Sequence, residues 1–317
     1  MLAVHLENGE VSVRRIARPR RKPGFSLVRL LAAGICNTDL ELQRGYYGFR
    51  GRPGHEFVGE VVDSDTQELV GKRVVGEINL ACRQCDWCAR GLERHCPHRS
   101  VLGIVRHPGA FAEFLTLPDA NLHVVPAAVS NEEAVFVEPV AAACEILDQV
   151  KIARGAEVAV LGDGKLGLLI GQVLMAHGAR VRQFGRHREK LNIVERAGAS
   201  VEVVTAKLPV AEFDFVVEAT GSAQGLQAAV RMTRPRGTVV MKSTVHGATP
   251  LDAAPVIVNE ITLVGSRCGR FAPALRLLAQ RKIAVADMIS ATRSLAQARE
   301  AFDLASTPGT LKVLLTP

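Results

Sequence analysis

Four cysteines lie close together in the first half of the chain, in the pattern Cys82-x2-Cys85-x2-Cys88-x7-Cys96. Four thiolates in so short a segment can close a tetrahedral shell around Zn²⁺, and a full shell of this kind leaves no open position. We therefore expect a structural zinc. An iron–sulfur cluster also takes four cysteines and is the smaller alternative, because the spacing differs from the ferredoxin patterns.

A second set of possible metal ligands is dispersed along the sequence and consists of Cys36, the adjacent pair His55 and Glu56, and Glu138. A thiol, an imidazole and a carboxylate suit a catalytic zinc that keeps one position open. His55 and Glu56 directly precede an apolar segment, where a charge is expected only with a partner. Their separation in the sequence does not show that these side chains meet in the fold.

A glycine-rich segment, Gly162-Asp163-Gly164-Lys165-Leu166-Gly167, matches the pattern G-x-G-x-x-G between a buried apolar run and an expected helix. Gly162 permits a tight turn, Gly164 lets the backbone approach a pyrophosphate, and Gly167 lets the helix pack on the strand. The backbone N–H groups at the helix start, including those of Lys165 and Leu166, attract phosphate. The segment indicates a dinucleotide site, against the alternative of a glycine-rich turn without a ligand.

The residues after the next expected strand bear on the choice between NAD and NADP. No acid occupies Phe184–Arg188, where an NAD site places Asp or Glu, and Glu189 already belongs to the following helix. Arg186, His187 and Arg188 instead offer hydrogen-bond donors to a 2′-phosphate. We predict a preference for NADP over NAD; the alternative is solvated charge at the start of a helix.

The elements that would carry these residues divide the chain into two parts. The first 130 residues contain many short apolar runs between Gly and Pro, which is typical of an antiparallel barrel or sandwich. The expected strands are Leu27–Ala33, Phe57–Val62, Lys72–Val75, Ala112–Leu117 and Leu122–Val125.

From Ser130, a possible N-cap for a helix over Asn131–Val150, strands and helices alternate and predict a doubly wound parallel sheet. The expected elements are strands Val158–Leu161, Arg180–Phe184, Phe213–Glu218, Gly237–Lys242 and Ile261–Ser266, and helices Lys165–His177 and Arg188–Ala197. The helix Pro273–Gln280 and the strand Leu311–Leu315 end the chain. We expect one domain over 1–130, rejoined by 271–317, and a second over 131–270.

Composition limits the possible functions. Of the 317 residues 48% are hydrophobic and 22% charged, which predicts a globular protein, while 4% aromatic residues argue against a stacking surface for nucleic acid. The net charge of +7 (39 minus 32) is mild. Six basic residues within Arg14–Lys22 are interpreted as a solvated strand edge, with an RNA-binding arm as the alternative. Neither an apolar stretch of membrane-spanning length nor a secretion signal is recognised, so we expect a cytoplasmic protein without a membrane segment.

These residues together resemble the medium-chain, zinc-dependent alcohol dehydrogenase family over essentially the whole chain. Its markers occur in the family's order: 33–39 (AGICNTD), 53–59 (PGHEFVG), the four-cysteine segment, 137–139 (VEP), the glycine loop, 218–221 (EATG) and 312–313 (KV). Glu138 stands where the liver-type enzymes have Cys, so the chain is more similar to the sorbitol and threonine dehydrogenase branches.

The resemblance implies an α/β protein with a GroES-like catalytic domain and a Rossmann domain, and two zinc ions per chain. Cys36, His55 and Glu138 would hold the catalytic zinc, Glu138 directly or through a water, with Glu56 as a neighbouring carboxylate that can enter the shell. Thr38 would hydrogen-bond the substrate oxygen, and the strand end from Val264 to Ser266 would face the nicotinamide. The implied reaction is hydride transfer between an alcohol or polyol and NADP, in a homodimer or homotetramer that binds no nucleic acid.

Some positions depart from the family pattern or have no assigned role. Many members carry His at the end of a proton relay where this chain has Glu41. Tyr46, Tyr47 and Trp87 are plausible substrate-pocket residues. Two remaining cysteines, at 144 and 268, are interpreted as packing residues. The sequence identifies neither the substrate nor the physiological direction of the reaction.

Three other functions are alternatives to the prediction of an alcohol dehydrogenase. Zinc-free carbonyl or enoyl reductases share the fold but usually lack the pair formed by Cys36 and His55. A zinc-ribbon nucleic-acid binder is suggested by the four cysteines, but the glycine loop argues against it. The third is a structural protein that binds the cofactor without catalysis.

Overall fold

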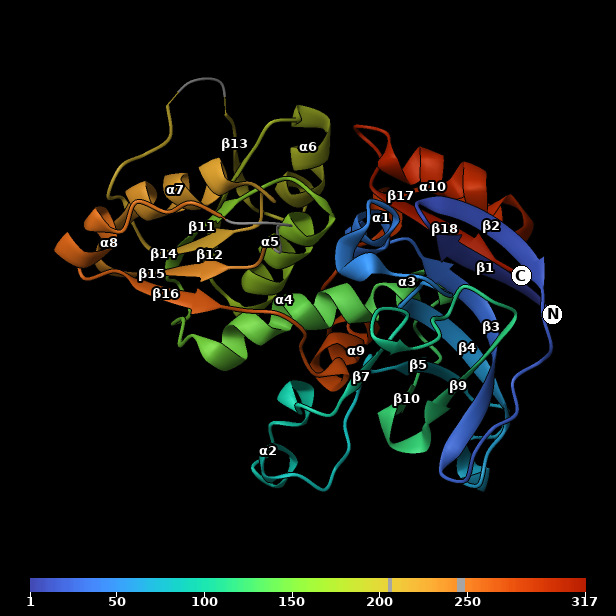
Figure 1. The fold of residues 1–317 in the computed structure, drawn as a ribbon. Helices are drawn as coiled ribbons and strands as arrows, with labels where there is room; N and C mark the ends of the chain where they lie inside the picture. Colours follow the sequence, from blue (N-terminus) through green and yellow to red (C-terminus); the bar gives the residue numbers. More distant parts are fainter. Residues whose placement is uncertain (205–206, 244–248) are drawn as a thin grey trace. The chain divides into compact units, whose positions relative to one another are not determined.

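The computed structural model describes residues 1–204, 207–243 and 249–317, which form two compact units (Figure 1). The first unit is Met1–Glu138 with Ile289–Pro317, and the second is Pro139–Met288. The sequence placed the boundaries earlier, after residues 130 and 270. Helix α3 (Asn131–Val135) accounts for the first difference, because it packs on strands β3 and β4 of the first unit.

Helix α9 (Phe271–Ala279) accounts for the second difference. It buries an apolar face made of Phe271, Ala274, Leu275 and Leu278, and it belongs to the second unit. Together with α4 (Val137–Gln149) and α5 (Lys165–His177) it lines a pocket of that unit. Only the segment from Ile289 onward therefore joins the first unit.

The first unit is the expected β-rich, GroES-like domain. Its largest sheet has seven strands; along the sheet they are β10 (Leu122–Val124), β5 (Arg73–Gly76), β4 (Glu56–Asp63), β3 (Phe25–Gly34), β18 (Lys312–Thr316) and β17 (Ile289–Ser294), with β9 (Phe114–Pro118) also paired to β3. The five strands predicted from the first 130 residues are all present, with bounds shifted by a few residues. The sequence did not predict β17, which pairs parallel to β18.

Two smaller sheets complete the strands of this unit. A hairpin of β1 (Leu2–Glu7) and β2 (Glu10–Arg15) precedes the large sheet, and the sequence did not predict it. A three-stranded sheet consists of β6 (Asn79–Leu80), β7 (Ser100–Leu102) and β8 (Arg106–His107). Strands β6 and β7 pair antiparallel and flank the cysteine segment, so they bring its two ends together.

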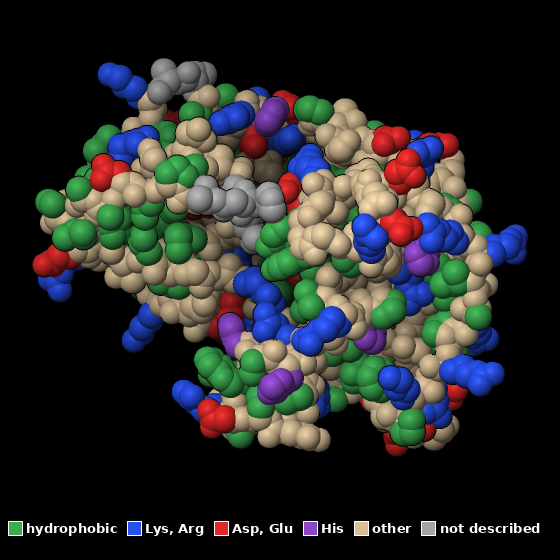
Figure 2. Space-filling model, in the orientation of Figure 1, with side chains coloured by type: hydrophobic (Ala, Val, Ile, Leu, Met, Phe, Trp, Pro, Cys, Tyr) green, Lys and Arg blue, Asp and Glu red, His purple; other side chains and the backbone are tan. Residues whose placement is uncertain are grey.

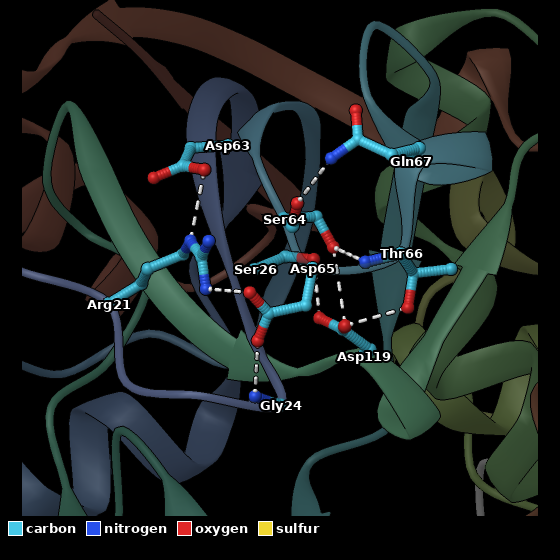
Figure 3. A network of polar contacts seen from close by, with 9 residues as sticks. All are labelled: Arg21, Gly24, Ser26, Asp63, Ser64, Asp65, Thr66, Gln67 and Asp119. Atoms are coloured by element: carbon cyan, nitrogen blue, oxygen red, sulfur yellow. Dashed lines mark hydrogen bonds and ion pairs between the residues drawn. The ribbon is translucent and has the colours of Figure 1, made fainter.

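A polar network ties the turn after β4 to the start of β3 and the end of β9 (Figure 3). Asp119 accepts hydrogen bonds from the hydroxyls of Ser26 (2.6 Å), Thr66 (2.8 Å) and Ser64 (3.2 Å). The guanidinium of Arg21 bridges Asp63 and Asp65 at 2.9 and 2.6 Å, and these neighbouring carboxylates raise the pKa of Arg21. A loop between strands thereby gains a defined conformation.

Several basic residues of Arg14–Lys22 have partners within the chain. Arg14 lies 3.1 Å from Glu7, and the guanidinium of Arg18 stacks 4.1 Å from the centre of the Phe114 ring. With Arg21 held by two aspartates, at least three of the six basic residues serve the local fold, in agreement with the interpretation as a strand edge.

The second unit contains a six-stranded sheet in which every neighbouring pair is parallel. The strand order is β13 (Ser200–Val203), β12 (Arg180–Gly185), β11 (Glu157–Leu161), β14 (Phe213–Glu218), β15 (Thr233–Met241) and β16 (Thr262–Gly265). The predicted Rossmann-type doubly wound sheet is confirmed. Helices α5 and α6 (Arg188–Arg196) pack on β11 to β13, and α7 (Ala223–Met232) packs on β14 and β15.

The helix expected over Asn131–Val150 is in fact two helices. Ser130 caps α3 as predicted, and its hydroxyl accepts from the N–H of Glu133, whose carboxylate accepts in turn from the N–H of Ser130. Phe136 then ends α3, and α4 starts at Val137. The prediction of one continuous helix was therefore wrong. Ala134, Val135 and Val137 on either side of Phe136 are apolar, so the pattern did not reveal a change of direction at this fully buried residue.

None of the helices in the described part of the chain is long and apolar enough to cross a membrane.

Candidate active site and metal centres

Strand register brings the dispersed ligand candidates of the first unit together. Cys36 follows the end of β3 and forms the N-cap of α1 (Asn37–Gln43), while His55 and Glu56 stand at the start of β4. In the β3–β4 ladder Gly34 pairs with Glu56. One ligand atom each from Cys36, His55 and Glu56 consequently lies within 4.8 Å of the other two. The pairing of two neighbouring strands thus produces the convergence that the sequence could not show.

Asp39 positions two of these three residues, and the sequence reasoning missed it. Its carboxylate is fully buried and accepts from the backbone N–H of Cys36 (2.9 Å) and of Gly54 (3.1 Å). It also lies 3.5 Å from Nδ1 of His55. Burial alone would lower the pKa of His55, but the charge of Asp39 and the contact with Cys36 raise it well above its ordinary value. Asp39 therefore holds the imidazole beside Cys36.

Lys312 is the second residue that the sequence reasoning missed in this site. Its ammonium group forms an ion pair with Oε2 of Glu56, and each side chain is 1% exposed. A Cβ at Gly34 would lie 2.8 Å from this carboxylate oxygen, so glycine is needed there. Burial alone would lower the pKa of Lys312, but the charges of Glu56 and then Cys36 raise it. The ion pair links β4 to β18, two strands that are more than 200 residues apart in the sequence.

Glu138 and Thr38 lie near this group without belonging to it. Glu138 lies in the first turn of α4, and its charge helps to raise the pKa of Lys312, but its carboxylate is outside the three ligand atoms that converge. Oγ1 of Thr38, a residue of α1, lies 3.8 Å from Sγ of Cys36. Glu41, at the relay position, pairs with Arg44 at 2.6 Å. The structure thus brings Cys36, His55 and Glu56 together and leaves Glu138 nearby.

The four clustered cysteines, expected to bind a structural zinc, lie close together. Cys85 is the N-cap of the short helix α2 (Asp86–Ala89). The Sγ–Sγ distances are 3.5 Å for Cys85–Cys88, 3.7 Å for Cys85–Cys96 and 3.5 Å for Cys96–Cys82. A tetrahedral site with Zn–S bonds of about 2.3 Å separates its sulfur atoms by roughly 3.8 Å. These distances fit a shared metal ion and are far too long for disulfide bonds.

The glycine loop joins β11 to α5 in the second unit and has the backbone that a dinucleotide requires. Gly162 has φ of +130°, and a Cβ there would lie 2.4 Å from the carbonyl oxygen of Ala219. A Cβ at Gly167 would lie 2.4 Å from the carbonyl oxygen of Gly162. A Cβ at Gly164 would meet no described atom within 4 Å, so this side of the loop is open to a ligand. Lys165 and Leu166 form the first turn of α5.

The segment after β12 is held by Asp163 of the glycine loop, a contact that the sequence did not suggest. Oδ2 of Asp163 accepts from the backbone N–H of Arg186 (2.6 Å) and His187 (2.7 Å) and from Nδ1 of His187 (2.9 Å). The side chain of Arg186 is exposed. Arg188 instead pairs with Glu195 along α6. The three proposed contacts to a 2′-phosphate are therefore not equivalent.

Val264 and Ser266 lie at the carboxyl end of β16. In a parallel sheet this end and the end of β11 share one edge, where open α/β sheets bind ligands. Val264 pairs with Val240 of β15, and the hydroxyl of Ser266 accepts from the ammonium of Lys242 (3.1 Å). The same ammonium donates to the carbonyl oxygens of Ala142 and Arg267 (2.7 and 2.8 Å). Lys242 is buried and fixes this strand end, which the sequence did not reveal.

Comparison with protein families agrees with this architecture. Residues 22–127 match the family model of the alcohol dehydrogenase GroES-like domain, and residues 166–280 match that of the zinc-binding dehydrogenase. The first match covers Cys36, His55, Glu56 and the four clustered cysteines. The second begins within the glycine loop and extends into α9.

Similar proteins support the same assignment over nearly the whole chain. The sorbitol dehydrogenase of Halalkalibacterium halodurans is 27% identical, with 95% of this chain and 94% of that protein covered. The D-altritol 5-dehydrogenase of Agrobacterium fabrum is 31% identical, with 82% of each covered. A zinc-binding dehydrogenase structure from Sinorhizobium meliloti 1021, bound to NADP, gives a TM-score of 0.90 at 29% identity and covers 100% of this chain and 99% of its own.

The chain belongs to the zinc-dependent medium-chain alcohol dehydrogenase family. Its activity is that of an NAD(P)-dependent alcohol dehydrogenase with a nicotinamide cofactor and zinc. The donor set of Cys36, His55 and Glu56, of which the last two are buried, suits that metal.

Proposed function

We propose that this enzyme transfers hydride between a polyol-type alcohol and NADP, and that each chain holds two zinc ions. The observation that carries the proposal is the convergence of Cys36, His55 and Glu56 within 4.8 Å of one another. The polyol class rests on the similarity to sorbitol and D-altritol dehydrogenases. The reverse reaction reduces the corresponding carbonyl compound.

Cys36, His55 and a carboxylate from Glu56 or Glu138 would hold the catalytic zinc. When bound, this metal supplies Lewis-acid stabilisation of a negative charge that develops on the substrate oxygen. Thr38, which lies beside Cys36, would hydrogen-bond the same oxygen and carry its proton away. Asp39 keeps His55 in place, and Lys312 compensates the charge of Glu56. Glu56 is held by Lys312, and Glu138, whose charge acts on the same lysine, would be the alternative carboxylate ligand.

The four-cysteine cluster would hold the second zinc. Because four thiolates complete its shell, this ion would have a structural role without access for a substrate. It would fasten the segment 81–99 to the small sheet of β6 and β7. Cys96 is fully buried, as expected for the anchoring member of such a cluster.

The cofactor preference rests on the end of β12. Arg186 extends into solvent beside the glycine loop, and His187 presents its remaining ring nitrogen there, since Nδ1 is bonded to Asp163. Arg186 can donate to a 2′-phosphate, and His187 adds a donor at Nε2 only as an imidazolium, whereas Arg188 is paired with Glu195. The loop residues Gly162–Gly167 would bind the pyrophosphate. Val264 and Ser266 would contact the nicotinamide, which accepts or returns the hydride.

A cofactor comparison with a matched pair of variants tests this proposal. Sorbitol, other alditols, simple alcohols and amino alcohols are assayed at 340 nm with NADP and with NAD. We expect the highest kcat/KM for an alditol with NADP. Arg186→Asp should shift the ratio of kcat/KM toward NAD at least tenfold, and Arg188→Asp should change it much less. A clear NAD preference of the wild-type enzyme would refute the NADP assignment.

We also infer a homodimer or homotetramer. Ile257 and Val258 of α8 (Ala254–Val258) are 73% and 79% exposed, and Figure 2 shows hydrophobic side chains gathered over this region. Strand β16 beside it is an edge strand of the sheet. Exposed apolar groups next to an open edge favour association with another copy. Light scattering of the enzyme should give a multiple of 34.0 kDa, and Ile257→Lys should lower that mass.

A further inference from the structure

Arg52 is a buried cation in the first unit. It is 8% exposed and lies in the extended segment before β4. Its Nε is buried and has no hydrogen-bond partner among the described residues. Burial lowers the pKa of Arg52 to about 10, so the guanidinium still carries its charge at neutral pH. A charge in this position requires compensation, because an uncompensated buried ion costs several kcal/mol.

Two histidines lie beside Arg52. An antiparallel bridge joins Leu6 to Gly51 through hydrogen bonds of 2.8 and 2.9 Å, so His5 and Arg52 are opposite each other at the next position. Nε2 of His5 is also buried without a hydrogen-bond partner in the described part of the chain. The N–H of Gly109 donates to the carbonyl oxygen of Arg52 at 2.8 Å, so the segment that follows His107 lies next to Arg52.

The charges around this cluster are mostly positive. Burial is the main cause that lowers the pKa values of His5 and His107, and nearby cations, including Arg52 in both cases, act in the same direction, while Thr116 opposes the effect on His107. The cations acting with Arg52 are Arg14 on His5 and Lys22 on His107. Glu7 also acts on His5, but its carboxylate is bound to Arg14 at 3.1 Å. Within the described residues, no carboxylate lies at ion-pair distance from Arg52.

The other buried cations of the described chain have hydrogen-bond or ion-pair partners. Lys312 is paired with Glu56. Lys242 donates to three oxygen atoms, including those of Ala142 and Ser266. The fold thus compensates these two ammonium groups internally, while the guanidinium of Arg52, beside an unsatisfied imidazole, has no such compensation.

We propose that Arg52, His5 and His107 form a binding site for a small oxyanion of the size of phosphate. The planar guanidinium can donate two parallel hydrogen bonds to such a group, and the ring of His5, whose Nε2 has no partner among the described residues, can add another. Nε2 of His107 faces the carbonyl oxygen of Thr116 at 3.0 Å, so His107 borders the site and contributes no donor to the anion. The anion supplies the missing negative charge. This site is separate from the glycine loop, which belongs to the other unit, and its ligand is either free phosphate or the phosphate group of a small ester.

Calorimetric titration of inorganic phosphate into the enzyme tests the proposal. Saturating NADP is present, so that the 2′-phosphate site is occupied, and ionic strength is held constant with NaCl. We expect one saturable site per chain, with Kd at least tenfold weaker in Arg52→Met. Arg50→Met, at an exposed position two residues away, should bind like wild type. Titration with glycerol 3-phosphate distinguishes the sources: tighter binding than phosphate identifies an ester as the ligand.

Two further measurements keep the proposal falsifiable. If Arg52→Met does not fold, Arg52→Lys retains the charge but loses the paired donors, and its Kd should still rise several-fold. Absence of saturable binding to wild type, or an unchanged Kd in the Arg52 variant that folds, would overturn the proposal. So would a fall in oligomer mass in Arg52→Met without phosphate binding to wild type, because a carboxylate of a second copy would then be the partner.

Discussion

Glu56 and Lys312 form a buried ion pair beside Cys36, with each side chain 1% exposed. Removing the ammonium group would leave the carboxylate buried without compensation. We therefore expect Lys312→Met to lower the free energy of unfolding by about 3–5 kcal/mol. The double variant Glu56→Gln, Lys312→Met should regain part of this loss, because neither charge remains.

Thermal unfolding of the full chain measures this coupling. Lys72→Met, at an exposed lysine of the same unit, is the matched control and should melt close to wild type. A Lys312→Met protein as stable as wild type would show that the ion pair does not contribute to the free energy of unfolding. So would a double variant whose loss equals the sum of the two single losses, because the side chains would then act independently.

His107 gives the enzyme a stability that depends on pH. Burial is the main cause that lowers its pKa below 6.5, although the carbonyl oxygen of Thr116, 3.0 Å from Nε2, acts in the opposite direction. Below pH 6.5 the unfolded chain binds a proton that the folded chain takes up less readily. Stability from this group is therefore present above pH 6.5 and falls as the pH drops, with a slope of at most ~1.4 kcal/mol per pH unit.

We expect His107→Gln to flatten this acid-side slope, since glutamine can still donate to Thr116 but does not titrate. Unfolding midpoints between pH 5 and 8 measure it. His177→Gln is a matched control, because the Nε2 of His177 contacts the carbonyl oxygen of Ile152 at 2.9 Å. Equal slopes in wild type and His107→Gln would show that His107 does not carry the effect.

At the scale of elements, two glycines of the loop after β11 have different roles. We expect Gly162 to be needed for folding and Gly164 for binding of the cofactor. Gly162 has φ of +130° and no room for a Cβ, so Gly162→Ala should destabilise the enzyme by roughly 1–3 kcal/mol. Gly164 has an ordinary φ of −76° and open space at its Cβ position. Gly164→Ala should therefore fold normally but bind NADP at least tenfold more weakly.

Thermal unfolding and fluorescence titration with NADPH distinguish these outcomes. If Gly164→Ala binds the cofactor like wild type, the pyrophosphate does not lie over this loop. A Gly162→Ala protein with an unchanged melting temperature would show that the turn can relax without cost.

Elements with a strong local signal were predictable from the sequence. The helix Lys165–His177 and the strand Phe213–Glu218 have the expected bounds. The helix ends at Gly178 in the left-handed conformation, and the strand is a mostly apolar segment, FDFVVE, before a Gly-containing turn. Such features depend on neighbouring residues alone.

Features that depend on distant residues were not predictable. The β1–β2 hairpin and β17 are short and partly polar, and the break at Phe136 lies inside an apolar segment. Within the site, Cys36, His55 and Glu56 were recognised from residue type and family resemblance. Lys312 was not, because only the pairing of β3 with β18 brings it to that group. Asp39 lies three residues after Cys36 in α1, but its proximity to His55 depends on the pairing of β3 with β4.

For the whole molecule, we propose two metal centres with different roles in one chain. The four-cysteine cluster would maintain a segment of the fold, whereas the group at Cys36 would carry the chemistry. Loss of one centre should therefore leave the other intact. Cys36→Ser should abolish turnover without unfolding the protein, and Cys144→Ala, which changes a buried cysteine outside both groups, should retain activity.

Zinc content measured together with alditol oxidation tests the central claim most directly. Elemental analysis of the wild-type enzyme should give two zinc ions per chain, with NADP reduction at 340 nm. Cys36→Ser should retain one zinc ion, an unchanged circular dichroism spectrum and no detectable turnover. A wild-type enzyme with a single zinc ion, or a Cys36→Ser enzyme that still oxidises the alcohol, would contradict the catalytic site described above.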